Sequence, residues 1–198
     1  GYYLPVTLVI SVDETSSNLS ATFVSLMKQQ YEGVINVLIS SFGPNKNPIL
    51  ENIEKNFPNI KVVHNYNTSS KTQALNQLLK DDIETELIIT IDSDSILTKN
   101  AISNMIDRYQ SDPTNTAIIT GALLVKNSRT NIITRSQEWD YFHGYSSEKR
   151  LQSMFQGAIQ VDTRFALFDV GILKHLDCQL DTDDMILTWH LLDENYRV

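Results

Sequence analysis

The chain has 198 residues, of which 41% are hydrophobic and 20% are charged, and 16 Lys plus Arg against 24 Asp plus Glu give a formal net charge of −8. A chain of this length folds as one domain whose core needs no disulfide or structural metal, and its single cysteine excludes an internal disulfide framework. An acidic surface repels phosphate backbones, so we expect no nucleic-acid partner, and no apolar run approaches the ~20 residues that span a bilayer.

Strand and helix patterns alternate through residues 1–95. Short runs rich in β-branched residues predict buried strands at 6–10, 34–39, 60–63 and 87–91. Apolar residues at helical spacing predict helices between them at 19–27, 49–57 and 74–79. This alternation implies βαβ units and a mainly parallel sheet, with functional loops at the carboxyl ends of the strands. The sequence therefore predicts a nucleotide-binding half over 1–95.

The second half, 96–198, is less regular. Its patterns predict a helix at 101–109, strands at 116–120 and 123–125, a helix at 137–150, an extended segment at 158–168 and a helix at 185–192. No repeat or low-complexity tract indicates a linker, so 1–198 is interpreted as a single domain. Both ends interrupt a pattern, and we expect flanking segments in the natural protein.

Asp92-Ser93-Asp94 directly follows a predicted buried strand. Two carboxylates in one loop can bind a hard divalent cation, and a diphosphate can fill the remaining coordination positions. A diphosphate next to two carboxylates requires such a cation. The structural alternative is a strand-end turn that caps a helix starting near Thr98.

Two further positions, Asp184 and Lys71, have either a chemical role or only a structural one. Asp184 stands just before an apolar helix containing Trp189 and can act as a general base, although Thr182 and the adjacent acids are also good capping residues. Lys71 precedes the helix at 74–79 and can meet a phosphate, or it is a solvated charge. The four histidines show no metal-ligand spacing.

Taken together and in order, these segments resemble the family 2 inverting glycosyltransferases of the GT-A fold. The strand and helix over 5–31 resemble the opening of that family. Lys71 to Asn76 resembles its Gly-Lys-x-x-Ala-Leu-Asn helix start, and Ile91 to Ser95 resembles its metal-binding Asp-x-Asp. Residues 137–141 are similar to the Gln-x-x-Glu-Tyr segment of membrane synthases that make poly-N-acetylglucosamine, hyaluronan, chitin or cellulose. Residues 182–198 resemble their Thr-Glu-Asp helix and Gly-Tyr ending.

The resemblance implies an α/β GT-A nucleotide-diphospho-sugar transferase fold, with a mainly parallel central sheet flanked by helices and an acceptor-side half over 96–198. Asp92 would lie near the ribose and the metal, Asp94 would bind Mg²⁺ or Mn²⁺, and Asp184 would take the proton of the acceptor hydroxyl. The donor would be a nucleotide-diphospho-sugar such as a UDP-sugar, contacted also by Lys71 and by Asp13 or Glu14.

The same resemblance implies a single in-line displacement that inverts the anomeric carbon. The acceptor would be a glycan or a lipid-linked molecule, in polysaccharide or glycoconjugate synthesis. The parent protein would work at the cytoplasmic face of a membrane, which it would contact through flanking segments.

Some positions depart from the family pattern. Ser40-Ser41-Phe42-Gly43 stands where the family has Asp-Asp-Gly-Ser, and Ser11 to Glu14 replaces Pro-x-Tyr-Asn-Glu, so Asp13 or Glu14 would replace a nucleotide contact. Asp169 falls near a family arginine. These departures favour an alternative, a catalytically silent relative that serves as a binding or scaffold module. A phosphatase with Asp92 as nucleophile is disfavoured, because its Asp-x-Asp normally follows the first strand.

Overall fold

The computed structural model describes residues 3–16, 18–68, 70–81, 83–112, 115–122, 132–141, 143, 149–154, 160–175 and 184–198. The strands are β1 (Val6–Val12), β2 (Ile35–Phe42), β3 (Ile60–Asn65), β4 (Leu87–Asp92), β5 (Ile118–Thr120) and β6 (Phe165–Asp169). The helices are α1 (Leu19–Met27), α2 (Pro48–Asn56), α3 (Lys71–Asp81), α4 (Ala101–Ser111), α5 (Ile132–Tyr141), α6 (Lys149–Met154), α7 (Val170–His175) and α8 (Asp184–Asp193).

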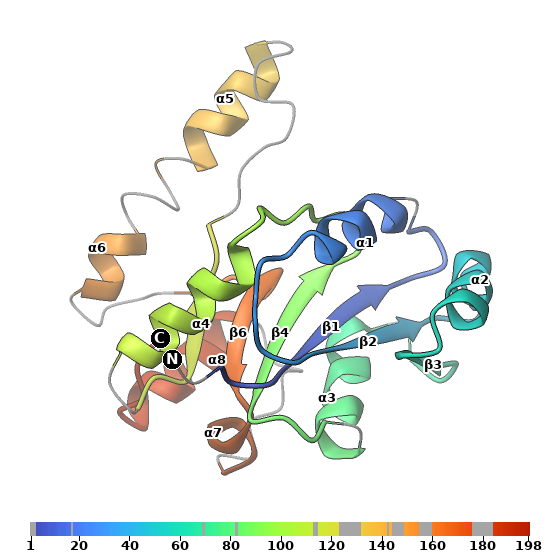
Figure 1. The fold of residues 1–198 in the computed structure, drawn as a ribbon. Helices are drawn as coiled ribbons and strands as arrows, with labels where there is room; N and C mark the ends of the chain where they lie inside the picture. The colour runs from blue at the N-terminus through green and yellow to red at the C-terminus, as the bar shows by residue number, and fades with distance from the viewer. Residues whose placement is uncertain are drawn as a thin grey trace.

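The strands form one sheet in the order β3-β2-β1-β4-β6-β5 (Figure 1). β3, β2, β1 and β4 pair in parallel, whereas β6 runs antiparallel to both β4 and β5. β1 and β4 lie side by side in the middle of the sheet. Their carboxyl ends therefore open at the same edge, where an open α/β sheet presents its ligand site.

Helices cover both faces of this sheet, which gives three layers (Figure 1). Side chains of α1, α2 and α4 share one buried cluster with Leu8 and Ile10 of β1. Side chains of α3, α7 and α8 share the other buried cluster with Val9. Because successive strand residues point to opposite faces, β1 needs apolar residues at nearly every position, and all seven of its residues are buried.

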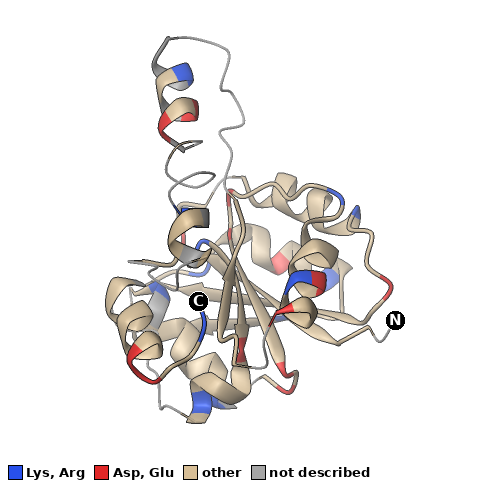
Figure 2. Cartoon of the chain, turned by 90° about the vertical axis from the view of Figure 1, so that its left-hand side faces the viewer, with Lys and Arg blue, Asp and Glu red and all other residues tan. Residues whose placement is uncertain are grey.

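The helices α5 and α6 lie apart from the two covering layers (Figure 1). Trp139 of α5 and Met154 of α6 are largely exposed. None of the helices in the described ranges is both long and apolar enough to cross a membrane. Figure 2 shows acidic and basic positions interspersed over the described elements.

The structure confirms the predicted alternation of strands and helices in the first half and the mainly parallel sheet. The second half differs more. The extended segment predicted at 158–168 contains β6, which runs on to Asp169, and α7 follows it without having been predicted. The helix predicted at 137–150 corresponds to α5, which starts earlier, and to the separate α6. The predicted strand at 123–125 and the cap at Thr182 lie outside the described residues.

Candidate functional site

The carboxyl edge of the sheet carries a row of polar residues on the face that α3 covers. Ser11 of β1 pairs in register with Ser40 of β2 on one side and with Asp92 of β4 on the other. Ser11 and Ser40 are buried, and within the described part of the structure the Ser11 Oγ has no hydrogen-bond partner. The apolar residues of these three strands thus give way, at the same level of the sheet, to polar side chains that can bind a polar ligand.

Asp92 is joined to Lys71, the first residue of α3. The Lys71 Nζ donates a hydrogen bond to the Asp92 Oδ1 and forms an ion pair with it, and each side chain keeps 27% of its surface exposed. The buried residues Leu75, Leu78 and Leu79 hold α3 against the sheet and so fix where the lysine starts. The sequence predicted the two residues as separate nucleotide contacts, and the structure brings them together.

Asp94 is exposed in the turn that follows β4. The Ser95 N–H donates to the Asp92 carbonyl at 3.1 Å, which closes the turn. Ser93 is tied back to other elements, because its carbonyl accepts from the Thr22 Oγ1 at 2.7 Å and its hydroxyl lies 2.9 Å from the Ser16 Oγ. The turn is therefore held in place while the Asp94 carboxylate faces solvent.

The structural alternative for these residues is right about the turn at the end of β4 but wrong about the helix cap. Helix α4 begins at Ala101, and the residue at its N-cap position is Asn100. Asp92 and Asp94 lie well before that residue and do not cap the helix.

Asp13 lies in the loop after β1, and its carboxylate is hydrogen-bonded to other residues of that loop. The Asp13 Oδ1 accepts hydrogen bonds from the Thr15 N–H, the Thr15 Oγ1 and the Ser16 Oγ, each at 2.9 Å. Burial opposes the charged form, but these hydrogen bonds outweigh it and lower the pKa of Asp13 below its usual value. Glu14 is exposed and accepts from the Asn45 Nδ2 at 3.0 Å.

Asn47 links this first loop to α2. Its side-chain oxygen caps the helix by accepting from the Ile49 N–H at 3.1 Å. Its amide nitrogen donates to the carbonyls of Asp13 and Ser16, both at 3.1 Å. Asn47 is buried, so this single residue positions the loop that carries Asp13 and Glu14.

A hydrogen-bonded serine and histidine stand where the family pattern has a carboxylate after the second strand. The His64 Nδ1 lies 2.8 Å from the Ser41 Oγ, and the His64 Nε2 lies 3.1 Å from the Gly43 carbonyl. A carbonyl only accepts, so Nε2 carries a proton. Tyr66 packs edge-on against the ring with a centroid distance of 4.1 Å and is exposed. His64 was not identified as a site residue from the sequence. The only sequence feature that pointed to this position was the unusual Ser40-Ser41 pair.

Asp184 is the first residue of α8. The preceding residues 176–183 lie outside the described ranges. Four residues later, Thr188 is fully buried and its Oγ1 accepts from the Val161 N–H at 2.9 Å. Helix α8 is thereby connected to the segment that precedes β6.

The donor set at this edge fits a hard divalent cation. Asp92 and Asp94 supply only carboxylate oxygens, and Mg²⁺ is commonly bound by one or two carboxylates together with water and substrate phosphates. In the described ranges, no three His, Cys, Asp or Glu side chains gather closely enough to bind a metal. The described residues therefore fit a two-carboxylate site whose remaining ligands come from a substrate.

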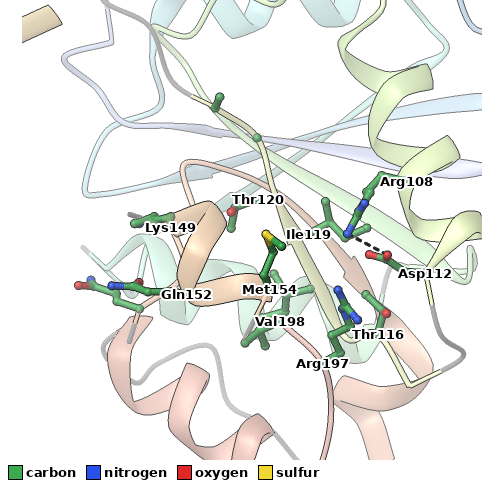
Figure 3. A pocket seen from close by; sticks show the side chains of 14 residues that line it. Arg108, Asp112, Thr116, Ile119, Thr120, Lys149, Gln152, Met154, Arg197 and Val198 are labelled. Carbon is green, nitrogen blue, oxygen red and sulfur yellow. Dashed lines mark ion pairs between the residues drawn. The ribbon is translucent and has the colours of Figure 1, made fainter. Parts of the chain in front are cut away.

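A separate cavity of about 500 Å³ lies beside β5 (Figure 3). Its lining includes Arg108 and Asp112, which form an ion pair at 3.0 Å, and Lys149 and Gln152 of α6. None of the site residues predicted from the sequence lines it. The predicted residues at the sheet edge and this cavity are therefore separate places in the fold.

The family-model match and the likeness of the sheet to solved structures identify a glycosyltransferase domain of the GT-A fold. The chain belongs to the glycosyltransferase like family 2, whose model matches residues 5–197. No curated protein matches the chain at a significant level.

Two solved structures share this fold. One is the mannosyltransferase PcManGT from Pyrobaculum calidifontis in complex with GDP-Man and Mn²⁺, with a TM-score of 0.71 and 16% identity over 99% of this chain. The other is TarS from S. aureus, with a TM-score of 0.57 and 16% identity over 95% of this chain. The chain spans 54% of the first protein's length and 33% of the second's.

Proposed function

We propose that this domain transfers a sugar from a nucleotide-diphospho-sugar to an acceptor hydroxyl with inversion at the anomeric carbon. The observation that carries the proposal is the contact between Lys71 and Asp92 at the carboxyl edge of the sheet, with Asp94 exposed in the next turn. It brings a cation suited to a phosphate into contact with one of two carboxylates suited to a metal. The complex of PcManGT with GDP-Man and Mn²⁺ supports this class of donor and a divalent ion.

Each residue has a distinct role in this proposal. Lys71 binds the donor diphosphate, and Asp13 or Glu14 contacts the nucleoside from the first loop. Asp92 lies near the ribose and, with Asp94, holds Mg²⁺ or Mn²⁺. When bound, the cation neutralises the charge that develops on the leaving diphosphate.

Asp184 is the proposed general base. An inverting displacement needs the acceptor hydroxyl on the side of the sugar opposite to the diphosphate, and a carboxylate there removes its proton as the new bond forms. Leu187 and Leu191 of α8 are buried in the core cluster on this side of the sheet, so the helix that starts at position 184 packs against the sheet.

The acceptor we propose is a glycan or a lipid-linked molecule, in polysaccharide or glycoconjugate synthesis at the cytoplasmic face of a membrane. The resemblance of residues 137–141 to a segment of the membrane synthases supports this setting. The exposed Trp139 within that segment adds an aromatic surface on which a sugar ring can stack.

Calorimetry with UDP and GDP, each with and without Mn²⁺, tests the donor site. We expect metal-dependent binding of one nucleotide, and Asp94→Asn should weaken it at least tenfold, since the variant removes one of two charged metal ligands. Glu84→Gln is the matched control, because Glu84 is an exposed acid that precedes β4 at the opposite end of that strand. Failure of both nucleotides to bind with metal present would exclude the proposal.

A second candidate, a catalytically silent binding module, is favoured by one observation. Ser41 and His64 form a hydrogen-bonded pair where the family has acids. A silent module of this kind would release no nucleoside diphosphate from GDP-mannose or UDP-N-acetylglucosamine. Release of product with either donor would therefore decide for the enzyme.

A further inference from the structure

The short segment of residues 161–164 is hydrogen-bonded to β4 at one end and to helix α8 at the other. The Arg164 carbonyl accepts the Asp92 N–H at 3.2 Å, and the Thr163 carbonyl accepts from the Thr90 Oγ1 at 2.6 Å. At the other end of the segment, the Val161 N–H donates to the Thr188 Oγ1 at 2.9 Å. The strand that ends in Asp92 and the helix that begins at position 184 are thus attached to the same short segment, 161–164.

An internal ion pair holds the shape of segment 161–164. The Asp162 carboxylate accepts from the Arg164 N–H at 3.0 Å, from its Nε at 3.0 Å and from its Nη2 at 2.6 Å. Asp162 is only 6% exposed. Charge-assisted, forked hydrogen bonds of this kind add geometric specificity as well as energy. The segment therefore acts as a spacer of fixed length between β4 and α8.

Thr188 is the point at which α8 meets this spacer. It is fully buried between the core residues Leu187 and Leu191, where a valine of the same shape would fill the same space. A buried hydroxyl is unfavourable unless it is hydrogen-bonded, and the Val161 N–H supplies that bond. Unlike apolar packing, a hydrogen bond is directional, so it fixes where α8 lies along its own axis.

We propose that Thr188 is a positioning residue for catalysis. Position 184 precedes it by about one helical turn, so the two positions share one face of α8. Through segment 161–164, the Thr188 hydroxyl sets how far position 184 lies from Asp92. This inference rests on the proposed function, in which Asp184 is the base and Asp92 holds the donor. A misplacement of about 1 Å between reacting groups can cost on the order of a hundredfold in rate.

The test compares Thr188→Val with Thr188→Ser in the full chain. Release of nucleoside diphosphate from GDP-mannose and from UDP-N-acetylglucosamine gives kcat and KM, and calorimetry gives the affinity for the nucleoside diphosphate. For Thr188→Val we expect kcat to fall by roughly tenfold to a hundredfold, with KM and nucleotide affinity unchanged. Thr188→Ser keeps the acceptor oxygen and should stay within about threefold of the parent protein.

Thr7→Val is the matched control for a loss of stability alone. Thr7 is also buried, and its Oγ1 lies 2.7 Å from the Thr85 Oγ1. It lies near the amino end of β1, so its loss should lower the melting temperature while kcat stays the same. Where Thr188→Val does not stay folded at the assay temperature, Asp162→Asn weakens the spacer and should lower kcat several-fold at unchanged nucleotide affinity.

The outcomes separate the two proposals. If the parent protein neither binds a nucleoside diphosphate nor releases one from either donor, the proposed function and this inference both fail. If the parent protein is active but Thr188→Val keeps its kcat, only the positioning role is wrong. The same holds if Thr188→Ser is as impaired as Thr188→Val, or if Thr7→Val loses kcat to the same extent.

Discussion

Replacing Lys71 by Met should have opposite effects on the two ligands of the proposed site. In the ligand-free protein the Lys71 ammonium holds the Asp92 carboxylate, so a cation that binds Asp92 competes with it. Removing the ammonium frees that carboxylate, and Mn²⁺ should bind more tightly. The nucleoside diphosphate, in contrast, loses a charged hydrogen-bond donor and should bind more weakly.

The structure gives the size of both effects. Two unit charges about 4 Å apart interact by roughly 1–4 kcal/mol between bulk water and a partly buried surface. Each of these side chains keeps 27% of its surface exposed, so about 1 kcal/mol remains, which corresponds to roughly fivefold tighter Mn²⁺ binding. A hydrogen bond to a charged group contributes about 1.5–3 kcal/mol, so diphosphate binding should weaken by roughly tenfold or more.

Electron paramagnetic resonance of free Mn²⁺ measures the first effect, and calorimetry with UDP or GDP measures the second. Lys71→Arg should bind Mn²⁺ like the parent protein, because it keeps the charge. Lys46→Met is the matched control, since the Lys46 ammonium pairs with Glu54 at 2.7 Å. Unchanged or weaker Mn²⁺ binding by Lys71→Met would show that Asp92 is not a metal ligand held back by the lysine.

Three further variants test the loops around the site. Asp13→Asn should destabilise the protein near neutral pH. Because folding lowers the pKa of Asp13, its contribution is present above the usual value of 3.8 and is lost as pH falls through the lower folded value, so thermal melts of the two proteins should converge in acid. Asn47→Ala loses the cap of α2 and the bonds to the first loop, and calorimetric melting should fall by roughly 4–8 °C for a cost of about 2 kcal/mol. Gly43→Ala meets no atom within 4 Å but must adopt a φ of +111°, so urea unfolding should show a loss of about 1–3 kcal/mol from backbone strain alone.

The sequence predicted the position of Asp92 and Asp94 for a simple physical reason. A run of apolar, β-branched residues can only be a buried strand here, and a carboxylate cannot continue it, so the strand ends at Asp92. The parallel topology then places this end beside that of β1 and at the same edge of the sheet as that of β2. Only the family resemblance suggested that Lys71 belongs to the same site as Asp92 and Asp94. Its contact with Asp92 depends on how α3 packs against the sheet, which the sequence pattern does not show.

The residues that the sequence did not identify act through contacts between distant segments. Thr188 and Val161 are 27 residues apart, and Thr90 and Thr163 are 73 residues apart. Thr188 fits an ordinary helix pattern and Thr90 an ordinary strand pattern, and nothing in the neighbouring sequence indicates a partner for either. The extended segment that contains β6 was predicted, but its antiparallel pairing with β4 was not, since periodicity does not show how a strand is paired.

The Ser41 and His64 pair changes the interpretation of the missing family acid. Sequence alone presented Ser40-Ser41 as the loss of a nucleotide contact, and that loss favoured a silent module. In the structure the position still has hydrogen-bonding groups, because the Ser41 hydroxyl and both ring nitrogens of His64 are fixed in one network with the Gly43 carbonyl. This network contains no carboxylate, so it adds no negative charge that would repel a diphosphate bound nearby. The departure therefore changes how a nucleoside would be contacted at the end of β2, while the carboxylates that fit a cation remain at the end of β4.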